Sequence, residues 1–407
     1  MIEAHNEFSV AAHWPGKFDE AGLRAWAEKL RARLSAPQVS LGLVFMAPHF
    51  FPHAADVLEV LRLHARIPLL LGCSGKSLIA GEQELEEDAG LVVGLYHLPG
   101  AKLKACHFTQ EEVEEANGPG YWHVETGVGP DDTNGWIAFA DPFHMDCEGW
   151  LRQWNEAYAP HPILGGLASG EPSQTSAQIY LNGEIFDEGG VALSVGGDVR
   201  LDGLISQGCT PIGDTWTITR ADRNVIFKIG NRRAYDVLAE TFNNLPPEEQ
   251  KQARGNLLVG LVVNEYLEDF HRGDFLIRNL MAADPGSGAI AVGALPRIGQ
   301  TIQFQRRDAA TGTEDITTLL EREKGRLSGQ RILGGCLCSC NGRGRRLFGV
   351  PNHDARHVQQ TLGRFGMAGF FCNGEIGPVG EKNFLHGYTA SLALFVQKEG
   401  SPAVPLA

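Results

Sequence analysis

The chain has 407 residues, of which 43% are hydrophobic and 21% charged, and its formal net charge is −14. This composition excludes a wholly disordered protein and predicts two or three folded domains. The negative charge argues against a nucleic-acid or anionic-membrane partner, because phosphate groups bind positive surfaces. No apolar run approaches the roughly 20 residues of a membrane span, and the first residues lack a secretory signal. We therefore expect a cytoplasmic protein, whose eight cysteines are free thiols.

Hydrophobic periodicity predicts alternating helices and strands. Apolar stripes predict helices over residues 23–34, 54–65, 150–158 and 316–327. Thr311 and Glu314 form a possible capping box before the last of these helices. The expected strands cover residues 41–46, 136–140, 216–220 with 225–229 as a hairpin, 257–264, 302–305 and 332–340.

One strand–helix–strand pattern occurs three times. In each copy the second strand ends in a Gly turn: Cys73-Ser74-Gly75-Lys76, Ala168-Ser169-Gly170-Glu171 and Cys372-Asn373-Gly374-Glu375. A further apolar strand follows each turn, at residues 91–96, 191–195 and 388–396. The repetition indicates one copied supersecondary unit whose turns are a shared structural or binding device.

The strand–helix–strand order predicts an α/β fold of mixed α+β layers, with two packed modules built from these related units. Two prolines interrupt the apolar pattern at residues 243–248 and mark the expected boundary. The predicted organisation is a helical lead-in (1–34), an N-terminal module (35–245), a C-terminal module (246–396) and a tail (397–407).

The most informative motifs lie between Gly335 and Phe395. They include Cys336-Leu337-Cys338-Ser339-Cys340-Asn341-Gly342-Arg343, then Pro351-Asn352-His353-Asp354, the third Gly turn and Phe384-Leu385-His386-Gly387. This stretch closely resembles the C-terminal module of the FIST family (F-box and intracellular signal transduction proteins). Residues 72–75, 84–86 and 91–93 resemble the N-terminal module, so the resemblance spans roughly residues 35–395.

The FIST resemblance implies a two-module sensory protein of the cytoplasm that binds a small ligand. Amino acids are often suggested as ligands of the family, and haem is reported for some relatives. Eukaryotic members carry an F-box, whereas here the module begins almost at once, so we expect no ubiquitin-ligase role. No output region is attached, so signalling would need a separate partner protein.

The residues themselves are compatible with a small ligand. Gly turns at strand ends expose backbone N–H groups, and ligands of open α/β sheets bind beyond the carboxyl ends of strands. Asn341 and Asn373 have amides that donate and accept, Arg343 could grip a carboxylate and Glu375 could receive an ammonium group. The predicted ligand-binding residues are Asn341, Arg343, Cys372, Asn373, Gly374, Glu375 and His386, with Asn264 and Glu265 at the end of another strand. The alternative is that these residues only shape turns and strand ends.

We predict no metal site. Cys336, Cys338 and Cys340 alternate along a strand, whereas zinc sites use Cys-x2–4-Cys turns, so with Cys372 they are expected to be buried apolar thiols. His353 and His357 lack the intervening Glu of the zinc-protease motif. The cofactor is therefore unknown; haem follows from the resemblance alone, with His49, His53, His353 and His386 as candidate axial ligands.

Two other classes of function stay open. A thiol-dependent enzyme could use Cys340 or Cys372 with His386, but Ser74 and Ser169 lack the Gly-x-Ser-x-Gly elbow and no catalytic constellation is convincing, so we expect no enzyme. A pure interaction scaffold would instead need an exposed apolar surface. Neither the ligand nor the oligomeric state can be read from the sequence.

Overall fold

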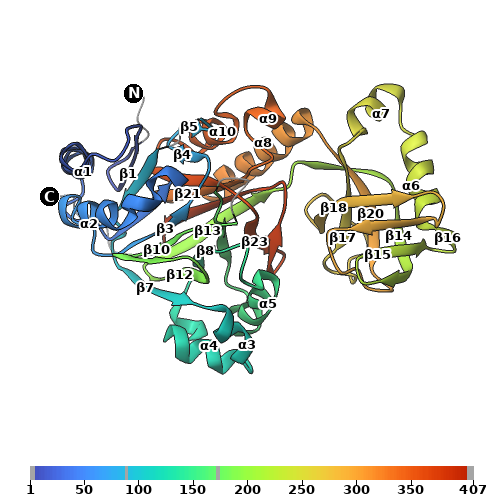
Figure 1. The fold of residues 1–407 in the computed structure, drawn as a ribbon, viewed down its shortest axis with the longest axis horizontal. Coiled ribbons are helices and arrows are strands. Elements are labelled where there is room, and N and C mark those ends of the chain that lie inside the picture. The colour runs from blue at the N-terminus through green and yellow to red at the C-terminus, as the bar shows by residue number, and fades with distance from the viewer. Residues whose placement is uncertain (1–4, 88–89, 171–174, 401–407) are drawn as a thin grey trace. The chain divides into compact units, whose positions relative to one another are not determined.

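A computed structural model describes residues 5–87, 90–170 and 175–400 (Figure 1). The chain divides into two compact units: unit 1 combines Met1–Ile205 with Thr318–Ala407, and unit 2 is the intervening Ser206–Thr317. In the described part of the chain, no helix has the length and apolar character required to span a membrane. Glu171 of the second turn and most of the predicted tail lie outside the described residues.

Unit 1 consists of the three repeats. The first comprises β1 (Ser9–Trp14), α1 (Glu20–Arg33), β2 (Leu41–Met46), η1 (Pro48–His53), α2 (Ala54–His64), β3 (Leu70–Ser74), β4 (Leu78–Ala80), β5 (Gln83–Leu85) and β6 (Leu91–Tyr96). The second comprises β7 (Ala101–Phe108), α3 (Gln110–Glu115), α4 (Pro119–Thr126), η2 (Pro130–Asp132), β8 (Trp136–Ala140), α5 (Cys147–Tyr158), β9 (Ile163–Leu167), β10 (Ile179–Leu181), β11 (Glu184–Phe186) and β12 (Gly190–Gly197). The segment predicted as a helical lead-in thus holds strand β1 as well as helix α1.

The third repeat comprises β13 (Val199–Ser206), α8 (Ala309–Arg326), β21 (Ile332–Cys340), α9 (Arg345–Phe348), α10 (His353–Leu362), β22 (Met367–Cys372), β23 (Glu375–Val379), β24 (Lys382–His386) and β25 (Ala390–Gln397). Unit 2 is inserted between the end of β13 and the second half of α8. Helix α8 begins after Asp308, whose Oδ1 accepts a hydrogen bond from Thr311 N–H at 2.9 Å. Asp308 therefore caps this helix. The predicted capping box of Thr311 and Glu314 is not the cap, because Thr311 lies inside the first turn.

Unit 1 contains three six-stranded sheets, each built mainly from one repeat, and the strands have the same order in all three. The orders are β1-β6-β2-β3-β10-β11, β7-β12-β8-β9-β23-β24 and β13-β25-β21-β22-β4-β5. The pairs β2/β3, β8/β9 and β21/β22 are parallel, and each is joined by a helical crossover. The last two strands of every sheet are a hairpin that comes from another repeat, so each Gly turn is the point at which the chain crosses from one sheet to the next.

The core of unit 1 lies between the three sheets. Phe45, Phe139 and Phe370 come from different sheets and contact one another, with ring centroids 4.9 to 5.8 Å apart. Helices cover the outer faces, and in Figure 1 those of the three repeats lie on three different sides of the strands. Their apolar stripes explain this, since Leu23 of α1 and Trp154 of α5 are fully buried.

Unit 2 has a different architecture. It comprises β14 (Cys209–Asp222), β15 (Val225–Ile229), β16 (Arg232–Arg233), α6 (Ala234–Asn243), α7 (Pro247–Ala253), β17 (Leu257–Val262), β18 (Phe275–Asp284), β19 (Ala289–Val292), β20 (Thr301–Arg307) and the first half of α8. Its seven strands form one sheet in the order β14-β20-β17-β18-β19-β15-β16, and β14 also pairs with β15, so the sheet closes on itself. The proline break at residues 243–248 falls between α6 and α7, inside this unit.

Candidate functional site

The carboxyl ends of the three parallel pairs are aligned by glycines. One glycine lies against the facing carbonyl oxygen in each pair: Gly72 against Val44, Gly165 against Ala138 and Gly369 against Leu337. A Cβ atom at these positions would lie 1.6 to 1.9 Å from that oxygen, so no larger residue fits without a backbone shift. Counting from these glycines makes Lys76, Ser169 and Asn373 equivalent. Matching the turns by their Cys-Ser-Gly motif aligns Ser74 with Ser169 and Asn373. The structural equivalent in the first turn is Lys76, two residues further along the chain.

The three turns are joined in a closed ring of hydrogen bonds, which we call the turn ring (Lys76, Ser169 and Asn373). The N–H of Ser169 donates to the carbonyl of Ser74 at 3.1 Å, and the N–H of Asn373 donates to the carbonyl of Leu167 at 3.1 Å. The Ser169 hydroxyl closes the ring: it accepts from the Lys76 N–H at 3.0 Å and donates to the Phe371 carbonyl at 2.5 Å. The repeated turns are thus one structural element.

Polar side chains stand at the turn ring. The Asn341 amide donates from Nδ2 to Asn373 Oδ1 at 2.9 Å, and Asn373 donates from Nδ2 to the Ala168 carbonyl at 3.1 Å. Asn341, Asn373 and Lys76 are all exposed. Two of the predicted ligand residues therefore meet at the carboxyl ends of β21 and β22, and sequence reasoning missed Lys76. The glycine register was the signal that could have found it.

Glu375 lies beneath the third turn and is fully buried. Its Oε1 is 3.2 Å from the Cys372 Sγ and its Oε2 accepts from the Thr389 N–H at 2.9 Å. Burial raises the pKa of Glu375 from 4.5 to about 7, although the hydrogen bond from Thr389 acts in the opposite direction. Glu375 and Cys372 therefore support the turn from inside, and neither presents a polar group to solvent.

Arg343 occupies a second buried cluster, formed on the other side of β21 with α10. Its Nε and one terminal nitrogen donate to the two oxygens of Asp354 at 2.6 and 2.9 Å, and both side chains are fully buried. The Ser339 hydroxyl donates to Asp354 at 3.0 Å, and His353 Nδ1 lies 2.9 Å from the same carboxylate. Burial alone would raise the pKa of Asp354, but the Arg343 charge and these hydrogen bonds hold it below its usual value. The Arg343 guanidinium is thus occupied by Asp354.

Glu84, from β5 of the first repeat, borders this cluster. Its carboxylate accepts from the backbone N–H groups of His353 at 3.1 Å and Ala355 at 3.0 Å, at the start of α10. Burial, with the charge of nearby Asp354, raises the pKa of Glu84 to about 7. The predicted sites did not include Glu84 or Asp354.

The remaining predicted residues lie elsewhere. His386 is buried, with Nε2 3.0 Å from the Gly377 carbonyl. Asn264 and Glu265 belong to unit 2, where Asn264 accepts from the Tyr266 N–H and Glu265 accepts from the Thr301 N–H and hydroxyl. These three residues have local structural contacts, and their predicted role toward a ligand stays a prediction.

The cysteines of the Cys336–Cys340 strand lie mostly in the core. Cys336, Cys338 and Cys372 are buried together with Cys73, and Cys340 is half-buried. Burial raises the pKa of the Cys73, Cys338 and Cys372 thiols well above the usual value. Such thiols are held protonated and are poor nucleophiles.

Of the four histidines named as candidate haem ligands, two border a cavity. This cavity, of about 720 Å³, is lined by Pro15, Gly16, Lys17, Phe18, His49 and His53. His53 stacks on Phe18 with ring centroids 4.5 Å apart. His353, by contrast, is buried and stacks on Phe348 at 3.4 Å.

Comparison with known proteins defines the class. The profile of the FIST N domain matches residues 40–232, and that of the FIST C domain matches residues 234–378. The chain therefore belongs to the FIST family. An uncharacterised protein of Mycobacterium tuberculosis is 34% identical over 372 residues, which is 91% of this chain and 94% of the relative. One from Mycobacterium bovis is 35% identical over the same length, and one from Methanocaldococcus jannaschii is 21% identical over 277 residues, 66% of this chain and 52% of the relative.

Proposed function

We propose that this FIST protein is a non-catalytic sensor that binds a small ligand at the turn ring. The observation that carries the proposal is the joining of three strand-end turns into one ring with exposed Lys76, Asn341 and Asn373 side chains. Ligands of α/β sheets bind beyond the carboxyl ends of strands, where backbone N–H groups and turn side chains are accessible.

The side chains at the ring suit a free amino acid. The Lys76 ammonium group can receive the ligand carboxylate, and the amide oxygens of Asn341 and Asn373 can accept from the ligand ammonium group. This assignment replaces Arg343 by Lys76 as the cation, because the Arg343 guanidinium is buried against Asp354. It also makes Glu375 a support of the turn and removes it from direct contact with the ligand.

The surroundings of the candidate nucleophiles support a role without catalysis. The Ser169 hydroxyl donates within the turn ring, and the Ser74 hydroxyl accepts from the Gln178 N–H at 3.1 Å. The thiol of Cys372 is buried with a raised pKa. A nucleophile needs to be activated and accessible. The pKa of the Cys372 thiol is raised instead of lowered, and the neighbouring Glu375 carboxyl group is buried with it. A sensor of this kind would pass its signal to a separate partner protein.

A thermal-shift screen of the twenty amino acids tests the proposal, because a ligand that binds only the native state raises the melting temperature. We expect at least one amino acid to stabilise the native protein, and this effect to vanish in Asn373→Ala and Lys76→Ala. Asn117→Ala and Lys29→Ala alter exposed residues away from the ring and should respond like the native protein. Stabilisation that persists in both ring variants would refute the site.

Haem binding is a second candidate function, favoured by the cavity that His49 and His53 line. Either imidazole could hold the iron, and Lys17 could pair with a propionate. When bound, haem would supply a site for a diatomic gas. The test is titration with haemin: we expect a Soret band that is lost in His49→Ala with His53→Ala and retained in His107→Ala, whose residue stacks on Phe186 outside this cavity. A band that survives the double substitution would exclude this cavity.

A further inference from the structure

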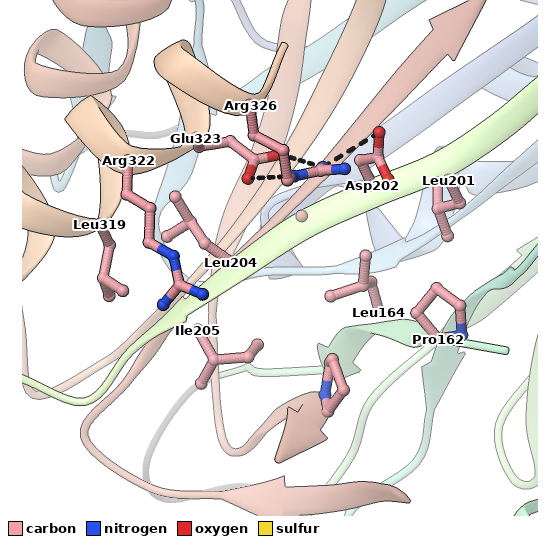
Figure 2. Close-up of a pocket in the computed structure, with 12 residues that line it drawn as sticks. Pro162, Leu164, Leu201, Asp202, Leu204, Ile205, Leu319, Arg322, Glu323 and Arg326 are labelled. Carbon is pink, nitrogen blue, oxygen red and sulfur yellow. Dashed lines mark hydrogen bonds and ion pairs between the residues drawn. The ribbon is translucent and has the colours of Figure 1, made fainter. Parts of the chain in front are cut away.

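A second cavity lies within unit 1, between α8 and the strands β9, β13 and β23 (Figure 2). Its volume is about 390 Å³, within the range of about 300–1,000 Å³ typical of small-molecule sites. The apolar part of its lining consists of Pro162, Leu164, Leu201, Leu204, Ile205, Leu319 and Pro378. This wall can bury the hydrocarbon part of a ligand.

The polar part of the lining comes mainly from α8. Glu323 is buried and pairs with Arg326, and Arg326 also lies 3.1 Å from Asp202. Asp202 is shared with Arg200, whose Nε is 2.7 Å from it. Both carboxylates of the cavity are thus already paired with guanidinium groups.

Arg322 is the exception. Figure 2 shows its side chain extending from α8 toward Ile205, with no dashed line to any of the residues drawn. No carboxylate in the described part of the chain forms an ion pair with the Arg322 guanidinium, and the side chain is exposed. The cavity therefore combines an apolar wall with one positive charge that is not balanced by a protein carboxylate.

This combination selects a class of ligand. A guanidinium group binds a carboxylate through two parallel hydrogen bonds, and the leucine and proline side chains favour an apolar body. Inorganic phosphate would leave the apolar wall unused, and a neutral apolar molecule would leave Arg322 unpaired. We propose that the cavity binds a small monocarboxylate with an apolar body, and that Arg322 receives its carboxylate.

The cavity is lined by residues from both points at which the chain passes between unit 1 and unit 2. Ile205 is the last residue before unit 2 begins, and Leu319 comes directly after unit 1 resumes at Thr318. A ligand in the cavity would therefore contact both chain segments that connect the two units.

Titration calorimetry with phenylacetate and 4-methylpentanoate tests the proposal, with phenylacetamide as a neutral analogue of the same shape. We expect the native protein to bind the carboxylates and Arg322→Ala to weaken that binding by about tenfold or more. Arg322→Lys should recover part of the loss. Lys324→Ala removes a neighbouring exposed cation of α8 and should bind like the native protein.

Three results would each overturn the proposal: neither carboxylate binds the native protein, Arg322→Ala binds as well as the native protein, or phenylacetamide binds as tightly as phenylacetate. The proposal does not depend on the turn ring. Asn373→Ala should leave phenylacetate binding unchanged, so failure at one site is distinguishable from failure at the other.

Discussion

Two buried carboxyl groups lie on opposite sides of the C-terminal end of β21, and their surroundings differ. Asp354 is held by the two-pronged contact with Arg343, with Ser339 and His353 as further partners. Glu375 accepts from the Cys372 thiol at 3.2 Å and from the Thr389 N–H at 2.9 Å. Arg343 contacts Asp354 directly and holds its pKa low, whereas at Glu375 the effect of burial exceeds that of the Arg343 charge and raises the pKa to about 7.

The two carboxyl groups therefore differ in how they respond to pH. The Arg343–Asp354 pair fixes the loop after β21 against α10 and stays charged, although the charge of the neighbouring Glu84 changes near pH 7. Glu375 supports the turn that carries Asn373, and its charge changes near pH 7. The turn ring therefore lies directly on a carboxyl group whose charge changes near pH 7.

The largest expected effect comes from removing the cation of the first cluster. Arg343→Met should destabilise the protein by about 3–5 kcal/mol, because it leaves the Asp354 charge buried without its partner. Chemical denaturation measures this loss. Arg346→Met, a change at an exposed arginine of the adjacent helix α9, should have an effect below about 0.5 kcal/mol. Equal effects of the two substitutions would show that the buried pair adds no stability.

The second cluster should make stability depend on pH. The folded pKa of Glu375, about 7, exceeds its ordinary value of 4.5, so the unfolded chain releases this proton first as the pH rises. Its contribution is fully present below about pH 4.5, is lost between pH 4.5 and 7 and is constant above that range, with a total of up to about 3 kcal/mol.

Glu375→Gln should therefore flatten the decline in unfolding free energy between pH 5 and 7.5. Glu84→Gln should flatten it too, because the pKa of Glu84 is also raised to about 7. Denaturation curves at several pH values measure both slopes. An unchanged slope in the two single variants and in the double variant would contradict the proposed surroundings of these carboxyl groups.

The glycine register of the repeats predicts a smaller effect. Gly369→Ala should destabilise by about 1–3 kcal/mol, because the new Cβ would lie 1.9 Å from the Leu337 carbonyl oxygen and the strands must move apart. Gly72→Ala should behave alike, and Gly165→Ala should cost more, because the φ of Gly165 is also +148°. Gly387→Ala, where no atom lies within 4 Å of the new Cβ, is the control and should be close to neutral. A neutral Gly72→Ala or Gly369→Ala would break the proposed equivalence of the repeats.

The smallest effect concerns the ring itself. Ser169→Ala removes the hydroxyl that joins Lys76 and Phe371 and should cost about 1–2 kcal/mol. Thermal unfolding of the variant beside Ser169→Thr, which keeps a hydroxyl, separates the hydrogen bonds from packing. If Ser169→Ala does not lower the melting temperature, the link between Lys76 and Phe371 through the Ser169 hydroxyl does not stabilise the ring.

Much of this fold follows from sequence patterns. Strands β2, β8 and β21 have the predicted limits, and the stripes that predicted α1, α2 and α5 are the buried faces of these helices. The reason is local: burial on one side imposes a period that a window of ten residues reveals. The meeting of Asn341 and Asn373 also followed from their place at strand ends.

Other features depend on distant pairing. Nothing in the residues around Arg343 distinguishes a carboxylate of the protein from one of a ligand, because the choice of Asp354 is made by the packing of α10 on β21. The amino-acid sequence of the turns likewise does not reveal which glycine lies against a carbonyl oxygen. The sequence therefore does not indicate that Lys76 is equivalent to Ser169 and Asn373. Unit 2 has ordinary strand patterns, and its insertion between β13 and the second half of α8 is seen only when the sheets are assembled.

The central claim is that the three turns form one ligand site. Hydrogen–deuterium exchange of the native protein, with and without a mixture of the twenty amino acids at about 10 mM each, tests it directly, since a bound ligand suppresses local opening. We predict that exchange slows together in residues 72–78, 165–170 and 370–376, and that it does not slow in Asn373→Ala. Slower exchange in only one of these segments, or in none, would contradict the account.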